Sequence, residues 1–179
     1  MRLPKRPDNF RAPVGEIVHS RMSGLTPTFV LEKTRKFAGS YSTAIMKGLK
    51  YEAKVHEYML KNFSRFYIKS PWFYFVDDEG GHWCQPDGLY INQKCGFIII
   101  VEIKHAHTSN AWWQLVGLYK PVVKSLFGDG FDYRLLEVVR WFEPSVNFPN
   151  IKLTSDPSYA PKAPNVGVHI LPESVLSGR

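Results

Sequence analysis

Residues 97–104 read Phe-Ile-Ile-Ile-Val-Glu-Ile-Lys, a run of aromatic and β-branched side chains that two charged residues interrupt near its end. A continuous apolar run of this kind predicts a central strand that is covered on both faces. Glu102 and Lys104 lie two positions apart, so their side chains leave the same face of that strand. This stretch therefore decides both the expected fold and the expected site.

The clearest helix lies upstream of this strand, over residues 42–63. Side chains recur there at alternating spacings of four and three, which predicts one face made of Ile45, Leu49, Glu52, His56, Met59 and Phe63. Glu52 and His56 are polar, so burying them on this face would cost free energy unless another group compensated. A metal ion could be that group.

Strands and a second helix are predicted on either side of the central strand. Extended patterns predict strands over 66–76, 82–91 and 131–142. Residues 109–127 predict a helix that Pro121 kinks or divides. The order of helix, three strands, helix and strand predicts an α/β or α+β fold with a central mixed sheet between helices.

The chain has 179 residues, enough for one domain whose core needs neither a metal nor disulfides to stabilise it. Prolines and basic residues in 1–24 predict an irregular basic N-terminal arm, and 25–142 is the expected domain. Prolines are frequent beyond Glu143, so 143–179 is expected to be an extended or partly disordered tail.

Charge and composition favour a polyanionic partner. The formal net charge is +7 and the pI is about 9.4, which favours nucleic acid or an anionic membrane surface. Aromatic residues make up 15% of the chain, enough both for a core and for stacking on bases. Cys84 and Cys95 fit neither a disulfide framework nor a structural zinc site. With no secretory signal and no run of roughly 18 apolar residues, we expect an intracellular protein without a membrane span.

Asp87 supplies a second carboxylate close to the central strand. If the strand over 82–91 pairs with the central strand as a hairpin, Asp87 lies beside Glu102 and Lys104. Two carboxylates without a balancing arginine repel each other, and a divalent cation is the ordinary remedy. Oxygen ligands without a nearby set of cysteines and histidines indicate Mg²⁺ or Mn²⁺ rather than zinc.

Each of these motifs also has a simpler interpretation. Pro86-Asp87-Gly88 alone is typical of a turn, and Glu102-Ile103-Lys104 alone is typical of a salt pair on a solvated face. Glu52 alone would be a charge on a helix surface. The order in which the motifs occur together favours a functional site.

At these residues the chain resembles the PD-(D/E)xK nuclease superfamily. The pattern of that superfamily is an Asp, a spacer and then Glu-x-Lys on adjacent strands, which Pro86-Asp87 and Glu102-Ile103-Lys104 match. The resemblance covers about residues 48–119 and implies a restriction-endonuclease-like core, with a central mixed β-sheet flanked by helices. It says nothing about either terminus.

Within the superfamily, the chain is most similar to the branch of phage lambda exonuclease and RecB-like nucleases. That branch places a Gly and a Glu on an upstream helix, matched by Gly48 and Glu52, and a Gln on the helix after the lysine strand, matched by Gln114. Relatives usually space this Gln and a Tyr as Q-x-x-x-Y, whereas four residues separate Gln114 from Tyr119 here. Some relatives add four cysteines for an iron–sulfur cluster, which two cysteines cannot supply.

The resemblance implies a catalytic set made of Glu52, Asp87, Glu102, Lys104 and Gln114. Asp87, Glu102 and the backbone carbonyl of Ile103 are expected to bind Mg²⁺, for which Mn²⁺ would substitute, and Glu52 to help hold this metal or a second one. Lys104 is expected to orient or deprotonate the attacking water through a lowered pKa.

Two further side chains have expected supporting roles. Gln114 is expected to position water or phosphate. His56 is expected to pack or to support the site from behind rather than to bind metal.

The implied reaction is Mg²⁺-dependent hydrolysis of DNA, by an exonuclease of phage-type recombination or repair. The candidate nucleic-acid contacts are Trp112, Tyr119 and His105, although a tryptophan in the core is the simpler interpretation. An endonuclease acting on DNA or RNA, and a noncatalytic nucleic-acid-binding module, stay open. So do a homo-oligomer and a partner protein of recombination or replication. The expected location is the cytoplasm of a bacterial or phage-infected cell.

Overall fold

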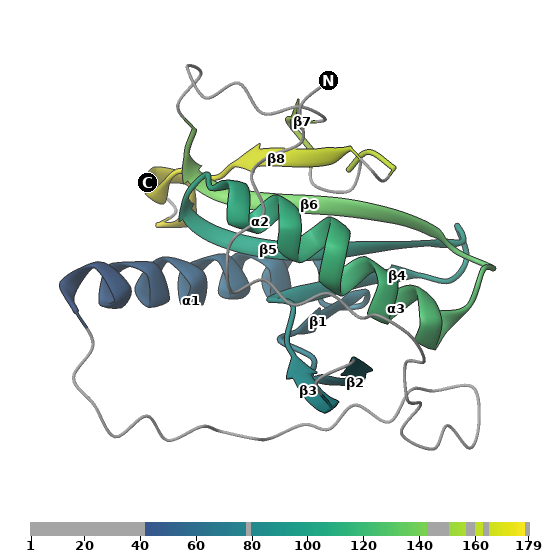
Figure 1. The fold of residues 1–179 in the computed structure, drawn as a ribbon. Coiled ribbons are helices and arrows are strands. Elements are labelled where there is room, and N and C mark those ends of the chain that lie inside the picture. Colours follow the sequence, from purple (N-terminus) through teal and green to yellow (C-terminus); the bar gives the residue numbers. More distant parts are fainter. Residues whose placement is uncertain (1–41, 78–79, 143–150, 157–159, 163–164, 178–179) are drawn as a thin grey trace.

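The computed structural model describes residues 42–77, 80–142, 151–156, 160–162 and 165–177 (Figure 1). The expected basic arm over 1–24 lies outside these residues. The described part is a mixed α/β structure in which helices flank a mixed sheet, as the sequence predicts, although this sheet has six strands (Figure 1).

The long helix α1 spans Thr43–Phe63, and Ser42 caps its N-terminus by accepting a hydrogen bond from the Ile45 N–H at 3.4 Å. Its bounds confirm the predicted helix, but the predicted apolar face was wrong in its first half. Ile45 and Leu49 are 50% and 42% exposed. The buried residues of α1 are Tyr51, Val55, His56 and Met59.

The physical reason for this difference lies far along the chain. The Tyr51 hydroxyl donates a hydrogen bond to the Leu171 carbonyl at 2.9 Å, so a residue with a polar tip can be buried. Spacing within α1 gives no sign of this acceptor, because 120 residues separate donor from acceptor.

The six-stranded sheet has the order β1-β4-β5-β6-β8-β7. Its strands are β1 Tyr67–Lys69, β4 Gly88–Asn92, β5 Phe97–Ala106, β6 Asp132–Trp141, β7 Ile151–Thr154 and β8 Val166–Ile170. Neighbours from β1 to β5 pair antiparallel, whereas neighbours from β5 to β7 pair parallel. β5 is the run quoted at the outset, and it lies inside the sheet between β4 and β6.

Each of the two strands predicted before β5 is divided in the structure. Phe73–Asp77 (β2) and Gly80–Cys84 (β3) leave the main sheet and pair with each other as a separate two-stranded sheet. Ser70 has a φ of +46°, in the left-handed region that interrupts an extended chain, and Pro71 follows it. Pro86 stands between β3 and β4. These breaks explain why single strands over 66–76 and 82–91 do not form.

The second helical segment is divided, as Pro121 predicts. It consists of α2 Ser109–Trp113, the π-helix η1 Gln114–Tyr119 and α3 Lys120–Phe127, with Pro121 in the first turn of α3, where its missing N–H is tolerated. No helix of the described residues is long and apolar enough to cross a membrane.

Two layers of helix cover the two faces of the sheet (Figure 1). Tyr51 and Val55 of α1 share a buried core with the odd-numbered residues of β5 from Ile99 to Ile103. Leu115 and Tyr119 of η1 share the other core with Ile98 and Ile100. Because strand side chains alternate between faces, Glu102 and Lys104 belong to the face that η1 covers.

The expectation of an extended C-terminal tail was wrong for residues 151–156 and 165–177, which contain β7, β8 and the short helix α4 Glu173–Leu176. β8 pairs with β6 on one side and β7 on the other, and Val166 and Val168 are fully buried. Pro161 and Pro172 lie between these elements rather than within them. Proline frequency therefore marks the connections here, while parallel pairing of β8 with β6 and of β7 with β8 stabilises the strands.

Val168→Ala should lower the free energy of unfolding by about 2 kcal/mol, since it opens a cavity in the core. Urea denaturation measures this change. The matched control is Leu153→Ala on the neighbouring strand, because Leu153 pairs with Val168 but is 62% exposed. Equal effects of the two substitutions would contradict a C-terminal segment that is integral to the core.

Candidate active site

Asp87 and Glu102 lie on neighbouring strands at the end of their paired region. β4 pairs with β5 in a register that matches Gly88 with Val101, so the next position places Asp87 opposite Glu102. Side chains of opposite residues share one face of a sheet. The predicted pairing of these two strands is thus confirmed, and it brings the two carboxylates together.

A direct hydrogen bond fixes the Asp87 side chain against β5. The Ile103 N–H donates to Asp87 Oδ2 at 2.6 Å. The N–H and C=O of one strand residue point toward the same neighbouring strand, so the Ile103 carbonyl also points to the side of Asp87. The register of β4 with β5 ends at Gly88 and Val101, before it reaches Ile103. Three oxygen-bearing groups therefore converge on this edge: Asp87, Glu102 and the Ile103 carbonyl.

The Glu102 carboxylate is buried, with only 2% of the residue exposed. Its Oε1 forms an ion pair with the Lys104 ammonium, whose side chain is 27% exposed. Its Oε2 is buried and has no hydrogen-bond partner among the described residues. A salt pair on a solvated face is therefore the wrong description of Glu102-Ile103-Lys104, since the acid lies in the core and only the lysine reaches solvent.

Glu52 approaches the site from α1 and is held by His56. Glu52 Oε1 lies 3.4 Å from His56 Nε2, and His56 Nδ1 lies 2.9 Å from the Tyr67 hydroxyl. His56 is 2% exposed. Because both ring nitrogens contact side chains, His56 supports Glu52 from within the core, which matches the supporting role expected for it.

The loop that carries Asp87 is tied to the end of β1. The Ser70 N–H donates to the Asp87 carbonyl at 2.8 Å, and Gln85 Nε2 donates to the Ser70 carbonyl at 2.8 Å. A Cβ on Gly88 would collide with the Tyr67 ring, so glycine is required there by close approach rather than by a turn. The Pro-Asp-Gly motif thus positions a carboxylate between two strands.

Glu137 is a buried acid that the motifs in the sequence did not identify. It is fully buried on β6, next to Glu102 in the parallel register. His107 Nδ1 lies 2.5 Å from its Oε2, and the Thr108 N–H donates to its Oε1 at 3.4 Å. One signal was present in the sequence, since Glu137 is the single charge within the apolar run Leu135 to Val139.

The expected nucleic-acid contacts divide into two groups. Trp112 and Tyr119 are 3% and 5% exposed and belong to the core under η1, so neither ring lies open for stacking on a base. The hydroxyl of Tyr119 instead accepts a hydrogen bond from Gln114 Nε2 at 3.2 Å. His105 is partly exposed, with its Nε2 3.1 Å from Arg140 Nη1.

Burial and repulsion by neighbouring carboxylates raise the pKa values of the paired acids. Burial, followed by the charges of Glu102 and Glu52, raises the pKa of Asp87 to about 8, although the Ile103 N–H and Lys104 lower it. Burial also raises the pKa of Glu102 to about 7, against the lowering effect of Lys104. Near neutral pH the pair therefore keeps part of its protons, because the positive charge nearby does not balance both carboxylates.

The pKa of Lys104 is raised, contrary to the lowered value expected for a base. Burial alone would lower it, but the charge and the hydrogen bond of Glu102, with further charge from Asp87 and Glu137, raise it more. Lys104 is consequently an ammonium ion at neutral pH.

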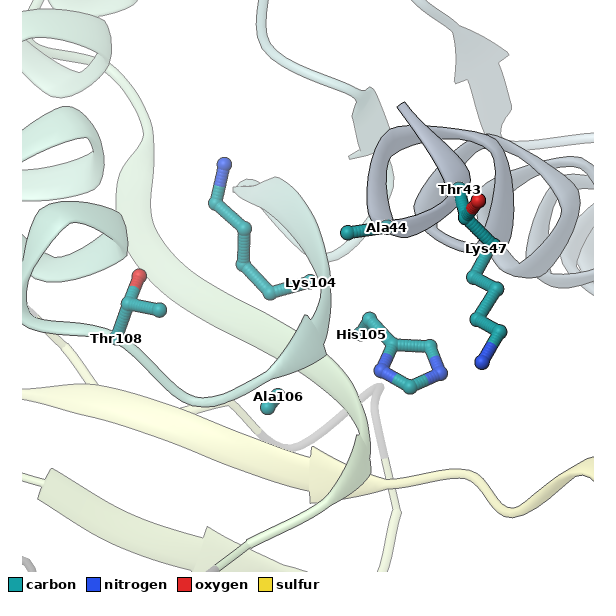
Figure 2. A pocket seen from close by; sticks show the side chains of 7 residues that line it. All are labelled: Thr43, Ala44, Lys47, Lys104, His105, Ala106 and Thr108. Atoms are coloured by element: carbon teal, nitrogen blue, oxygen red, sulfur yellow. The ribbon is translucent and has the colours of Figure 1, made fainter. Parts of the chain in front are cut away.

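An open pocket of about 640 Å³ adjoins Lys104 between the first turns of α1 and the end of β5 (Figure 2). Its lining consists of Thr43, Ala44, Lys47, Lys104, His105, Ala106 and Thr108. Figure 2 shows the side chains of Lys47 and His105 on one side of this pocket and Lys104 extending away from β5. The lining contains two lysines and no acid, so its charge suits an anion.

The chemistry of the donor set fits a hard divalent cation. Among the described residues, no group of three or more His, Cys, Asp or Glu is arranged so that it could hold a metal ion. The fit rests instead on two carboxylates and one backbone carbonyl, with Glu102 Oε2 buried and lacking a partner in the described part of the chain. All of these ligand atoms are oxygens, which Mg²⁺ and Mn²⁺ prefer.

Without metal, the protein should lose stability as the pH rises from about 5 to about 8. Asp87 and Glu102 have folded pKa values above their ordinary ones, so the folded state binds more protons than the unfolded chain in this range. Thermal unfolding in EDTA measures the slope. Mg²⁺ should raise Tm more at pH 8 than at pH 5.5, because metal binding needs the deprotonated carboxylates.

The control for this experiment is Asp87→Asn, whose side chain cannot titrate. Its Tm should depend less steeply on pH, and Mg²⁺ should stabilise it less than the wild type. A pH slope and a Mg²⁺ response identical to those of the wild type would contradict the role assigned to Asp87.

Comparison with known proteins adds no relative with this geometry. No protein-family model matches the chain, and no curated protein or solved structure shows significant similarity to it. The chemistry of the site therefore follows from its own side chains.

Proposed function

We propose that this chain is a metal-dependent nuclease that hydrolyses the phosphodiester bonds of DNA, built on a restriction-endonuclease-like core of the PD-(D/E)xK type. The observation that carries the proposal is the pairing of the partly buried Asp87 with the buried Glu102, with Lys104 beside them. Acids with pKa values raised by burial lower the stability of a fold. Their presence at one place therefore favours a functional site. Their position next to a basic pocket supports an anionic substrate.

Asp87, Glu102 and the Ile103 carbonyl would hold Mg²⁺ or Mn²⁺, and Glu52 would add a further carboxylate from α1. When bound, the metal supplies a Lewis acid that polarises the scissile phosphate and activates water. Glu102 bridges the two parts of the site, since its Oε1 pairs with Lys104 while its Oε2 is left for another cation.

Lys104 acts as a positive charge rather than as a base. Its raised pKa keeps the ammonium protonated, so it cannot accept a proton from water at neutral pH. It can orient the attacking water and offset the charge that develops on the phosphoryl oxygens. This role differs from deprotonation of the water, which a lowered pKa would have allowed.

The pocket at the end of β5 provides a path for the substrate backbone. Lys47 of α1 and Lys104 of β5 line this pocket. A nucleic-acid strand that contacts both lysines would pass beside the edge of the sheet where Asp87 and Glu102 lie. Phosphate contacts of this kind account for most of the affinity of nonspecific nucleic-acid binding. A noncatalytic binding module would explain the lysines but gives no reason to pair Asp87 with the buried Glu102.

Exonuclease action in phage-type recombination or repair is the form of the activity that we propose. Its support is Glu52 on the upstream helix and Gln114 on the downstream helix, as in the exonuclease branch that the sequence resembles. The metal chemistry itself is equally suited to internal bonds, so the substrate's topology decides between the two.

Asp87→Asn and Lys104→Met should each lower Mg²⁺-dependent cleavage by about a thousandfold, since each removes a group that acts on the reacting phosphate. Cleavage is followed on labelled linear duplex DNA with Mg²⁺, Mn²⁺ or EDTA. The matched control is Lys152→Met, because Lys152 is an exposed lysine on β7 far along the sheet from β4. Circular dichroism checks that each variant is folded.

Wild-type rates from Asp87→Asn or Lys104→Met would contradict the proposed site, and undiminished cleavage in EDTA would contradict the metal. Closed circular duplex DNA, single-stranded DNA and RNA complete the comparison. Degradation of linear but not circular DNA supports the exonuclease, whereas cleavage of circles shows an endonuclease.

A further inference from the structure

The helix over the site contains one turn of π-helix, Gln114–Tyr119, between α2 and α3. A π-turn accommodates one more residue than an α-turn, so it brings residues five apart onto one side of the helix, where an α-helix aligns residues four apart. Gln114 and Tyr119 are five apart, and they are in contact. Isolated π-turns within α-helices are frequent at functional sites.

The contact between these two side chains has a defined polarity. Gln114 Nε2 donates to the Tyr119 hydroxyl at 3.2 Å. The other end of the amide, Gln114 Oε1, is buried and has no hydrogen-bond partner among the residues that the structure describes. The amide NH₂ group therefore donates to Tyr119, while the amide oxygen is available to accept a hydrogen bond from another group.

The pair lies over the same face of the sheet as the acids. Tyr119 shares a core with Ile98 and Ile100 of β5, and Glu102 follows these residues on that face. The charges of Glu102 and Asp87 act on the Tyr119 hydroxyl and raise its pKa, after burial itself. Gln114 contacts Tyr119, so its amide lies on the side of the sheet where the proposed reaction takes place.

We propose that Tyr119 is a positioning residue that orients Gln114 across the π-turn, so that the amide oxygen accepts a hydrogen bond from the attacking water. This inference rests on the proposed nuclease function. It narrows the role of Gln114, since an amide carbonyl oxygen can accept a hydrogen bond from water but cannot donate one to a phosphate oxygen. It also replaces the DNA contact expected of Tyr119 with a buried structural contact.

The orientation can be tested without any activity, by NMR of the side-chain amide of Gln114 in the full chain. In the wild type, the NH₂ protons should exchange slowly because Tyr119 accepts from them. Tyr119→Phe keeps the ring and removes the acceptor, so exchange should accelerate at least tenfold. Unchanged exchange in this variant would overturn the proposed orientation, whether or not the chain cleaves DNA.

The role in catalysis is tested by a double-mutant cycle on kcat and KM. Tyr119→Phe should lower kcat about tenfold with little change in KM, as expected for the loss of one orienting hydrogen bond. In a Gln114→Leu background, the same substitution should have no further effect. An equal loss of kcat in both backgrounds would show that Tyr119 does not act through Gln114.

The π-turn itself is tested by changing its length. Deleting Gly117, which has no side chain to pack, converts the spacing to that of an α-turn and should preserve both the slow amide exchange and Tm within a few degrees. Inserting one alanine after Gly117 should abolish the slow exchange. Loss of the contact on deletion, together with its retention on insertion, would contradict the proposed alignment.

If the wild type cleaves no nucleic acid while the Gln114 amide protons still exchange slowly, the proposed nuclease function is wrong and the Gln114–Tyr119 geometry stands.

Discussion

The hydrogen bond from the Ile103 N–H to Asp87 is the constraint on which the rest of the site depends. It extends the pairing of β4 with β5 by one side chain, just where the backbone register ends. Two acids are thereby held on one face, although burial and repulsion both oppose their ionisation. Ser70, in its left-handed conformation, and the glycine that admits the Tyr67 ring keep the Asp87 loop in place. The fold thus holds two carboxylates together without enough positive charge to balance them, so a cation or a proton must bind.

Lys104 and the Glu137–His107 pair compensate the negative charge of the buried acids in two different ways. Lys104 neutralises one oxygen of Glu102 and stays partly in solvent. Glu137 lies beside Glu102 on the neighbouring strand, yet its charge is directed to His107 and the Thr108 N–H. Glu137 is therefore directed away from a cation that would bind at Asp87 and Glu102. This arrangement lets the partly buried Asp87 and the buried Glu102 and Glu137 share a small volume without all facing the same cation.

Much of this arrangement could be predicted from the sequence, where short-range patterns were decisive. The apolar run of β5, the bounds of α1 and the division of the second helix at Pro121 all follow from local periodicity and proline chemistry. What could not be predicted depends on distant partners. His107 and Glu137 are 30 residues apart, and Tyr51 meets Leu171 across 120. The spacing of Gln114 and Tyr119 was visible as an anomaly, but its meaning required the π-turn. The prolines of the C-terminal segment predicted an extended tail in place of β7 and β8. Composition does not predict such short strands, because their stability comes from pairing with parallel neighbours.

The position of β8 within the sheet has a consequence for biosynthesis. Residues 166–170 pair with β6, which precedes them by more than twenty residues, and β7 adds to the outer side of β8. Until these residues leave the ribosome, β6 presents an apolar edge with unpaired backbone groups, and such edges associate with other chains. Nascent or prematurely terminated chains are consequently the form most exposed to aggregation. Because β6 also carries Glu137, the sheet beneath the acids is completed only after this late strand has been made.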